Sequence, residues 1–517
     1  MTKRRHSPFR SWVEVSADSP FPVENLPFGI LHPRAGGEAR VGVAIGEHIL
    51  DLAELAGAGL FSRALPETPG VFGRGSLNAY LALGRPAWRR VRAALQRLLS
   101  LDVPDLRDDV AVRARALVAQ NGVDMLLPVE AGDFTDFYAS REHATNVGSM
   151  FRPENPLLPN WVHLPVAYHG RSRSIVVSGT PVRRPLGQVK PDDACTPSFG
   201  ASRQLDLELE LGAVVGLGNE LGAPVPAAAA LDHVFGFVLL NDWSVRDVQK
   251  WEYQPLGPFL EKNFATTISP WVFTLDALEP FRCAQPGQVP EPLPYLRTRG
   301  ALAYDIHLEV SLQSSAMSFP AVIARSNARH LYWNLAQMVA HHTCGGCNLR
   351  PGDSLGTGTI SGPTEDSLGS LLELAWRGTR PLVLPSGEKR AFLEDGDTVI
   401  LRGWCQGEGY RVSGSANAAA PCFRRPRRGD PWACRPGVAA GAASRRDVGH
   451  RSGRKAPPAG SASWLYNVPR LFCSRSIASK SARKLPSPKP SEFPRRWMTS
   501  KNSVGRSKTQ RVKSCSR

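Results

Sequence analysis

Leucine and acidic residues alternate strictly over residues 205–211, which read Leu-Asp-Leu-Glu-Leu-Glu-Leu. Because the side chains of a strand point alternately to its two faces, a strand here would present leucines on one face and carboxylates on the other. Acids on the same face lie roughly 6–7 Å apart, so their charges repel unless water or a cation lies among them. The pattern therefore predicts a strand whose acidic face is either solvated or binds a metal.

The apolar pattern elsewhere predicts a small mixed region followed by a larger β-rich one. Residues 86–99 have the spacing of a helix, with one apolar stripe and arginines off it, and short strands are expected at 41–45 and 49–52. From residue 128, short apolar runs punctuated by Gly and Pro predict many short strands, interrupted by a helix at about residues 329–342. We divide the chain into a basic leader at 1–10, a first domain at 11–127, a β-rich domain at 128–412 and a tail at 413–517.

The formal charge of +17 comes from the tail. Residues 413–517 hold 24 of the 63 Lys and Arg residues and 3 of the 46 acidic residues, which leaves 39 bases and 43 acids for the rest of the chain. The tail is rich in Arg, Ser, Pro and Gly and has no sustained periodicity, so we expect it to be disordered. Nucleic acid is therefore expected to bind at most non-specifically, through this tail.

Nine cysteines without a regular framework indicate reduced thiols and a cytoplasmic protein. Cys344 and Cys347 lie just after His341 and His342 and raise a zinc hypothesis, although no second pair follows at zinc-site spacing. No stretch approaches the roughly 20 apolar residues that a bilayer span requires, and no apolar run of signal-peptide length follows the basic N-terminus. We therefore expect no membrane segment.

Residues 132–143 concentrate acids, a phenol and an imidazole. If this segment is helical from about Thr135, then Asp136, Ser140 and His143 share one face. A lone histidine is more often structural than catalytic, but a carboxylate on the same face makes His143 a candidate acid or base.

Two further segments carry polar groups next to apolar ones. Residues 241–250 follow an apolar strand, and Arg246 and Gln249 would point the same way in a helical turn. Residues 255–264 form a loop bounded by Gly and Pro that carries Lys262. Each segment alone is compatible with an ordinary polar surface.

Taken together, these segments resemble the fumarylacetoacetase family. The resemblance rests on ordered motifs over residues 11–412. They include Asn-Trp-Val-His-Leu-Pro-Val-Ala-Tyr-His-Gly-Arg at 160–171, Lys-Pro-Asp-Asp at 190–193, the acidic strand, the run 241–258, Asn-Leu-Arg-Pro-Gly-Asp at 348–353, Gly-Thr-Ile-Ser-Gly-Pro at 358–363 and Gly-Trp-Cys-Gln-Gly at 403–407. Chance does not supply so many matches in order.

The resemblance implies a mixed, β-rich fold: a small SH3-like N-terminal β-barrel followed by a mixed β-roll catalytic domain, working as a homodimer. It also implies two cations. The family's Ca²⁺ site corresponds to Asp136, Glu208, Glu210 and Asp242. Its Mg²⁺ position corresponds to Asp242, Lys262 and Thr266, with Lys262 contributing its backbone carbonyl because an ammonium group cannot bind a cation.

The reaction that the resemblance implies is metal-dependent hydrolysis of a carbon–carbon bond between two carbonyls. The diketo acid fumarylacetoacetate would yield fumarate and acetoacetate, in the last step of tyrosine and phenylalanine breakdown. The base would be His143, oriented by Glu373. Developing oxyanion charge would be stabilised by Arg246, Gln249 and Lys262, and the substrate contacts would be Tyr138, Arg152, Tyr168, Gln249, Tyr253 and Thr359.

The chain departs from the family pattern in two places. Glu261 and Ala265 occupy positions beside Lys262 where the family usually has small residues, and residues 413–517 do not resemble the family's ending. A decarboxylase or isomerase acting on a related oxo-diacid could share the scaffold and the metal site. His143 paired with Glu373 favours water activation over these rivals.

Overall fold

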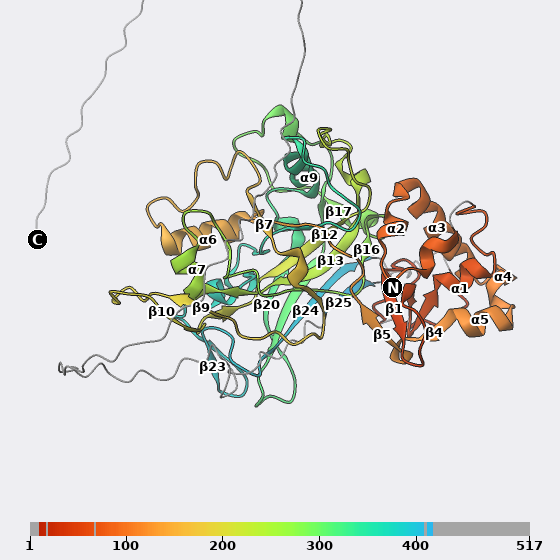
Figure 1. Ribbon diagram of the computed structural model, residues 1–517, viewed down its shortest axis with the longest axis horizontal. Helices are drawn as coiled ribbons and strands as arrows, with labels where there is room; N and C mark the ends of the chain where they lie inside the picture. The colour runs from red at the N-terminus through yellow and green to blue at the C-terminus, as the bar shows by residue number, and fades with distance from the viewer. Residues whose placement is uncertain (1–9, 17–18, 67–68, 408–410, 417–517) are drawn as a thin grey trace, which may run out of the picture. The chain divides into compact units, whose positions relative to one another are not determined.

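The computed structural model describes residues 10–16, 19–66, 69–407 and 411–416. These residues form an N-terminal region and a larger β-rich region, drawn in red to orange and in orange to blue in Figure 1. This is the predicted mixed, β-rich fold, with a small SH3-like barrel preceding a β-roll. The predicted leader lies outside the described residues except for Arg10, whose carbonyl accepts a hydrogen bond from Leu101 N. None of the described helices is long and apolar enough to cross a membrane.

The N-terminal region is a five-stranded antiparallel sheet with helices packed against it. The strand order is β4-β3-β2-β1-β5. The strands are β1 Phe28–Pro33, β2 Arg40–Ile45, β3 His48–Asp51, β4 Leu117–Ala119 and β5 Val123–Leu126; the helices are α1 Leu52–Gly57, α2 Asn78–Leu81, α3 Gly84–Leu99, α4 Pro104–Arg107 and α5 Val110–Ala116.

Helix α3 confirms the helix predicted at residues 86–99. Its apolar stripe, which includes Trp88, Val91 and Leu95, is buried in the core of the N-terminal region. Most of its arginines are exposed, as the pattern predicts. Arg92 differs, because its guanidinium donates to the backbone carbonyl of Asn25 at 2.8 Å and is partly buried.

The larger β-rich region is built on a mixed eight-stranded sheet. Its order is β7-β6-β21-β12-β13-β15-β8, with β16 also paired to β13. Two neighbouring pairs, β6 with β21 and β8 with β15, are parallel, and the others are antiparallel. The strands are β6 Phe134–Phe137, β7 Ala167–Gly170, β8 Ile175–Val177, β12 Leu209–Val215, β13 Val234–Asp242, β15 Thr266–Ile268, β16 Phe273–Thr274 and β21 Ser354–Gly356. Strand β13 is buried along its whole length, as its apolar sequence predicts.

A second sheet has the order β20-β19-β24-β25, and β13 packs against its strands β24 and β25. Its strands are β19 His307–Gln313, β20 Ala321–Asn327, β24 Thr398–Gln406 and β25 Arg411–Ala416. Two-stranded pairs are formed by β9 Leu186–Val189 with β10 Ser198–Ala201, β11 Leu205–Asp206 with β14 Ser244–Val245, β17 Arg282–Cys283 with β18 Ala303–Tyr304 and β22 Leu382–Val383 with β23 Lys389–Arg390. The helices of this region are α6 Arg141–Phe151, α7 Arg246–Glu252, α8 Leu275–Leu278, α9 Leu335–Thr343 and α10 Leu371–Leu374.

The predicted helix from Thr135 is wrong. Asp136 lies in strand β6, and α6 begins only after Ser140, whose hydroxyl caps the helix by accepting from His143 N. The sheet pairs β6 on both edges, so backbone pairing outweighs the local helical spacing. Asp136 and His143 therefore do not share a helical face.

Two predicted boundaries also move. The helix expected at 329–342 begins at Leu335, because Asn334 and Gln337 form a capping box there. Residues 413–416, assigned to the disordered tail from their composition, instead complete strand β25, which pairs with β24. Backbone pairing at a sheet edge does not require apolar side chains. The remainder of the predicted tail, residues 417–517, lies outside the described residues.

Candidate active site

The alternating segment 205–211 lies in the core, so its solvated interpretation is wrong. It contributes β11 and the start of β12, and its four leucines pack in the hydrophobic core. The acids on the opposite face are equally inaccessible: Asp206 is 0% exposed, Glu208 4% and Glu210 0%. Buried carboxylates need cationic partners, hydrogen-bond donors or protons.

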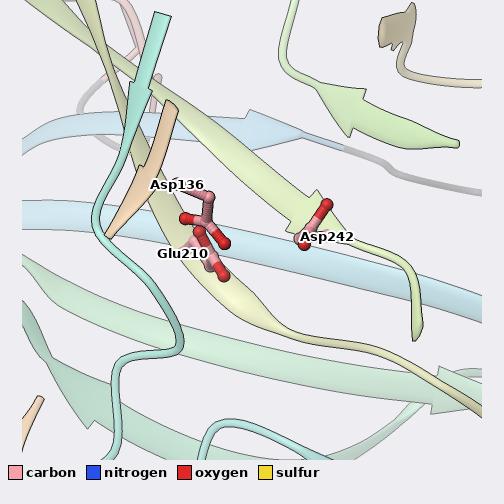
Figure 2. Close-up of side chains that lie close together, drawn as sticks. All are labelled: Asp136, Glu210 and Asp242. Carbon is pink, nitrogen blue, oxygen red and sulfur yellow. The ribbon is translucent and has the colours of Figure 1, made fainter. Parts of the chain in front are cut away.

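Glu210 meets two other carboxylates, and Figure 2 shows the three together. Asp136 comes from β6, Glu210 from β12 and Asp242 from the end of β13, and one oxygen of each lies within 4.8 Å of the others. All three side chains are buried. Within the described part of the chain, this is the group of His, Cys, Asp and Glu residues close enough to hold a metal ion.

A glycine in the neighbouring strand allows the carboxylates of Asp136 and Glu210 to lie close together. Strand β21 lies between β6 and β12, and its Gly356 is opposite Asp136 on one side and Gly212 on the other. A Cβ atom at Gly356 would lie 2.4 Å from Asp136 Oδ1 and 3.1 Å from Glu210 Oε2. Because β21 carries no side chain here, the two carboxylates approach each other across it.

The cluster is electrostatically unsatisfied without a cation. Burial, reinforced by the charge of Asp242, raises the pKa of Asp136 to about 7. Burial and the charge of Asp136 raise the pKa of Glu210 well above its ordinary value. Among the residues that the structure describes, neither carboxylate oxygen of Glu210 has a hydrogen-bond partner. Three buried carboxylates, of which Glu210 has a described hydrogen-bond donor on neither oxygen, fit a hard divalent cation.

Glu208 lies in different surroundings, although it is two residues from Glu210. Its Oε1 accepts from Arg246 Nη2 at 2.7 Å, and its Oε2 accepts from Lys262 Nζ. Burial alone would raise the pKa of Glu208, but the charges of Lys262 and Arg246 outweigh it and hold the pKa below its ordinary value. Glu208 therefore stays ionised, between two cations.

The same two cations bind neighbouring acids. Arg246 Nε donates to Asp206 Oδ2 at 2.8 Å, and Lys262 Nζ donates to Asp242 Oδ2 at 2.6 Å. Burial would lower the pKa of Arg246, but Glu208 and Asp206 raise it above its ordinary value. Both side chains are thus held as cations beside the acidic cluster.

Asp242 links the lysine to the acidic cluster. Its Oδ1 accepts from Thr266 Oγ1 at 2.8 Å, and its Oδ2 accepts from Tyr168 OH at 2.8 Å as well as from Lys262. Thr266 faces Asp242 across the β13–β15 pairing, which explains their contact. The predicted Mg²⁺ residues Asp242, Lys262 and Thr266 therefore lie together.

His143 and Glu373 form a buried pair. Ser140 caps α6 and Ser370 caps α10, so His143 and Glu373 each lie in the first turn of a capped helix. His143 Nδ1 is 2.7 Å from Glu373 Oε2, and the two side chains are 4% and 0% exposed.

Three more donors hold Glu373 in place. Asn146 Nδ2 donates to Oε1 at 2.9 Å, Ser370 Oγ donates to Oε2 at 2.8 Å, and Ser361 Oγ lies within 3.0 Å of both oxygens. Burial alone would raise the pKa of Glu373, but the charge of His143 and these hydrogen bonds lower it below its ordinary value. A carboxylate here accepts the Nδ1 proton, which leaves Nε2 as the basic nitrogen of His143.

The pair adjoins a cavity of about 480 Å³. His143, Asp136, Glu208, Arg246 and Lys262 line it. All of the predicted substrate-contacting residues line it too: Tyr138, Arg152, Tyr168, Gln249, Tyr253 and Thr359. The ring of Tyr138 meets that of His143 edge-on, with centroids 5.2 Å apart. A second cavity of about 290 Å³ reaches Asp242 and Thr266 and shares Tyr168 and Lys262 with the first.

The sequence did not reveal several residues that complete this site. Asn146, Ser361 and Ser370 orient Glu373, and Asp206 joins Arg246 to α10 by accepting from Leu371 N and Leu372 N. Asn146 follows His143 at helical spacing, a signal that was available in the sequence. The serines come from segments more than 200 residues away from the histidine, and no local pattern connects them.

The cysteine pair belongs to no metal cluster in the described part of the chain. Cys344 and Cys347 are exposed free thiols, and Cys344 Sγ contacts the carbonyl of His341 at 3.1 Å. Cys195, Cys283 and Cys405 are also free.

Glu261 lies beside Lys262 in the loop at residues 255–264, here called the lysine loop, and is buried. Its Oε2 accepts a hydrogen bond from Phe259 N at 2.7 Å, so the Glu261 side chain contributes to the conformation of this loop.

Comparison with known proteins places the chain in a family. Residues 133–409 match the family model described as fumarylacetoacetate (FAA) hydrolase C-terminal, and residues 24–128 match the model described as fumarylacetoacetase N-terminal. The fumarylacetoacetases of Bos taurus, Arabidopsis thaliana and Homo sapiens are 54%, 53% and 52% identical to it over 404 residues, which span 78% of this chain and 96% of each relative. The chain belongs to the fumarylacetoacetase family.

Proposed function

We propose that this protein hydrolyses fumarylacetoacetate to fumarate and acetoacetate, the last step of tyrosine and phenylalanine breakdown. The observation that carries the proposal is the buried His143–Glu373 pair, whose histidine lies on the wall of a cavity that Arg246 and Lys262 also line. Relatives over 50% identical along nearly their full length carry the name fumarylacetoacetase.

His143 is the general base in this proposal. Glu373 accepts the Nδ1 proton, so Nε2 takes a proton from water while the water oxygen attacks the ketone carbon on the fumaryl side. The carbon–carbon bond to the acetoacetyl fragment then breaks, and its electron pair leaves as an enolate. The proton held on Nε2 passes to the enolate carbon and restores neutral His143, and the new carboxyl group of the fumaryl fragment releases its remaining proton to solvent, giving fumarate and acetoacetate.

In this proposal Arg246, Gln249 and Lys262 stabilise the oxyanions. Arg246 Nη1 donates to Gln249 Oε1 at 3.2 Å, which leaves the amide NH₂ of Gln249 to donate into the cavity. Lys262 is held by Glu208 and Asp242 at the same wall. Removing one such donor costs roughly 10²–10³ in rate in other enzymes. Tyr138, Arg152, Tyr168, Tyr253 and Thr359 are proposed to contact the substrate, as their place on the cavity wall supports.

We propose that Asp136, Glu208, Glu210 and Asp242 hold Ca²⁺, and that Asp242, Thr266 and the backbone carbonyl of Lys262 hold Mg²⁺. The unpartnered oxygens of Glu210 and the all-oxygen donor set support a cation of this kind. A divalent ion bound there would supply Lewis-acid polarisation of the diketone oxygens.

The test is an assay of the purified full-length chain on fumarylacetoacetate. We expect fumarate and acetoacetate in equal amounts, with activity lost after chelation and restored by Ca²⁺. Release of CO₂, or a shifted double bond without cleavage, would instead identify a decarboxylase or an isomerase on the same scaffold.

We also propose that the protein acts as a homodimer in the cytoplasm. Exposed apolar side chains, such as Leu256 at 97% and Phe259 at 61%, support association, and the free thiols among the described residues support a reducing compartment. Light scattering of the eluted peak in size-exclusion chromatography tests the first proposal. Fractionation of the source cells tests the second.

A further inference from the structure

The substrate of the proposed reaction carries two carboxylates, and both need cationic partners in the cavity. Four lysine and arginine side chains line the 480 Å³ cavity in the described part of the chain: Arg152, Arg246, Lys250 and Lys262. They differ in how firmly their charge is already neutralised. That difference determines which of them is free to recognise the substrate.

Two of the four are bound to buried acids. Arg246 is paired with Asp206 and Glu208, and Lys262 with Glu208 and Asp242. The side chains of these acids are at most 6% exposed, so separating either cation from them would leave a buried charge unpaired. These two cations are therefore not free to bind a carboxylate that enters and leaves.

The other two have weak or displaceable partners. Arg152 has a buried Nε with no hydrogen-bond partner in the described part of the chain, and its Nη2 reaches the carbonyl of Pro156 only at 3.5 Å. Lys250 Nζ is 2.5 Å from Asp192 Oδ1, but the Asp192 side chain is 83% exposed. Water readily replaces a lysine at so exposed an acid, because exposed ion pairs contribute little. Lys250 follows Gln249 on α7, at the cavity wall.

We propose that Lys250 is a specificity-determining residue that binds one of the two substrate carboxylates, while Arg152 binds the other. Asp192 holds the Lys250 ammonium at the cavity until a substrate carboxylate replaces it. This inference rests on the proposed function. The inference explains why the enzyme would select dicarboxylates: two available cations on the cavity wall match the two carboxylates of the substrate.

The experiment compares Lys250→Met and Arg152→Met in the full chain, using inhibition by fumarate and by acetoacetate as well as turnover. Each product keeps one of the two original carboxylates. Lys250→Met should raise KM for fumarylacetoacetate about 10-fold, with kcat within about two-fold, which is the size expected for losing one charge-assisted hydrogen bond. It should also raise the inhibition constant of one product about 10-fold and leave that of the other unchanged.

Arg152→Met should weaken inhibition by the opposite product. Asp192→Asn, which frees Lys250, should lower KM about two-fold. The matched control is Lys389→Met, which removes an equal charge from an exposed position in β23 and should change no constant. Melting curves of all variants establish that they remain folded.

The inference is overturned if Lys250→Met leaves both inhibition constants unchanged, or if the Lys250 and Arg152 variants weaken inhibition by the same product. A fall in kcat at unchanged KM would also overturn it. Wild-type protein that releases no fumarate contradicts the proposed function itself. Wild-type protein that does so, with Lys250→Met unaffected, contradicts this inference alone.

Discussion

Glu208 and Glu210 lie two residues apart in one acidic segment, yet their carboxylates have opposite electrostatic surroundings. Glu208 lies between Arg246 and Lys262, whereas Glu210 faces Asp136 and Asp242. The alternation of residues 205–211 predicts that both acids point to the same side of a strand. It does not distinguish them, because their partners come from β6, α7, β13 and the lysine loop, which are remote in sequence.

Neutralising these two acids should therefore change stability in opposite directions. In chelator, Glu210→Gln should raise the free energy of unfolding by about 1 kcal/mol, because it removes repulsion among carboxylates. Glu208→Gln should lower it by about 3 kcal/mol, because two buried cations lose their shared counter-charge. Urea denaturation of the chelated proteins measures both values. Equal stabilisation by both variants would contradict the separate surroundings assigned to the two acids.

The acidic cluster also predicts how pH affects the metal-free protein. Asp136 has an ordinary pKa of 3.8, and in the folded protein its pKa is about 7, so the folded state binds the proton more tightly than the unfolded state does. Below about pH 4, Asp136 is protonated in both states and does not affect the free energy of unfolding. Between about pH 4 and 7, its raised pKa lowers the free energy of unfolding progressively as the pH rises. Denaturation in chelator should show this loss, and saturating Ca²⁺ should cancel it. Parallel curves with and without Ca²⁺ across this range would contradict the prediction.

At the residue scale, His143 is expected to act through Nε2, because Glu373 holds its Nδ1. His143→Ala should lower turnover by at least roughly 10²-fold, within the usual contribution of a general base, while product binding persists. Glu373→Gln should also lower turnover, because an amide can present its NH₂ to Nδ1 and favour the wrong tautomer. His32→Ala, in strand β1 of the N-terminal region, is the control and should leave turnover unchanged. Near-normal turnover of His143→Ala would place the base elsewhere.

At the scale of elements, the sequence predicts some parts well and others poorly for identifiable reasons. Helix α3 was predictable because its stripe and its arginines are determined locally. The 134–143 segment was not, because the pairing of β6 with β21 comes from a segment some 220 residues away. The resemblance to a family supplied the site residues that local patterns could not connect, such as Glu373.

Strand β21 provides a prediction at this scale. Gly356→Ala should weaken Ca²⁺ binding by at least about 10-fold and destabilise the protein by roughly 1–3 kcal/mol, because its methyl group would overlap the Asp136 carboxylate. Gly200→Ala is the matched control: this glycine also lies in a strand, and a methyl group there would meet no atom of the described residues within 4 Å. Calorimetric titration with Ca²⁺ measures the affinity. An unchanged Ca²⁺ affinity in Gly356→Ala would show that Asp136 and Glu210 do not need the space left by the missing side chain of Gly356.

At the scale of the whole molecule, charge and chemistry belong to different parts of the chain. The tail carries the net positive charge, while the part before it has 39 bases and 43 acids. The residues that line the cavity lie between Asp136 and Thr359, and Glu373 follows shortly after. The overall basic charge by itself would indicate a polyanionic partner. Its concentration in the tail means that it gives no such indication for the part of the chain that carries the site.

Truncation after about residue 420 should therefore leave turnover within a few-fold of the full-length value. The truncated chain keeps all of the site residues and strand β25, whose backbone pairs with β24. It loses a segment whose composition offers no apolar core and no candidate acid, base or metal cluster. Truncation at residue 410 is the sensitive comparison, because it removes β25, exposes the edge of β24 and should lower the melting temperature. A hundredfold loss of turnover in the longer variant, with its fold and oligomeric state intact, would show that the tail contributes to the chemistry.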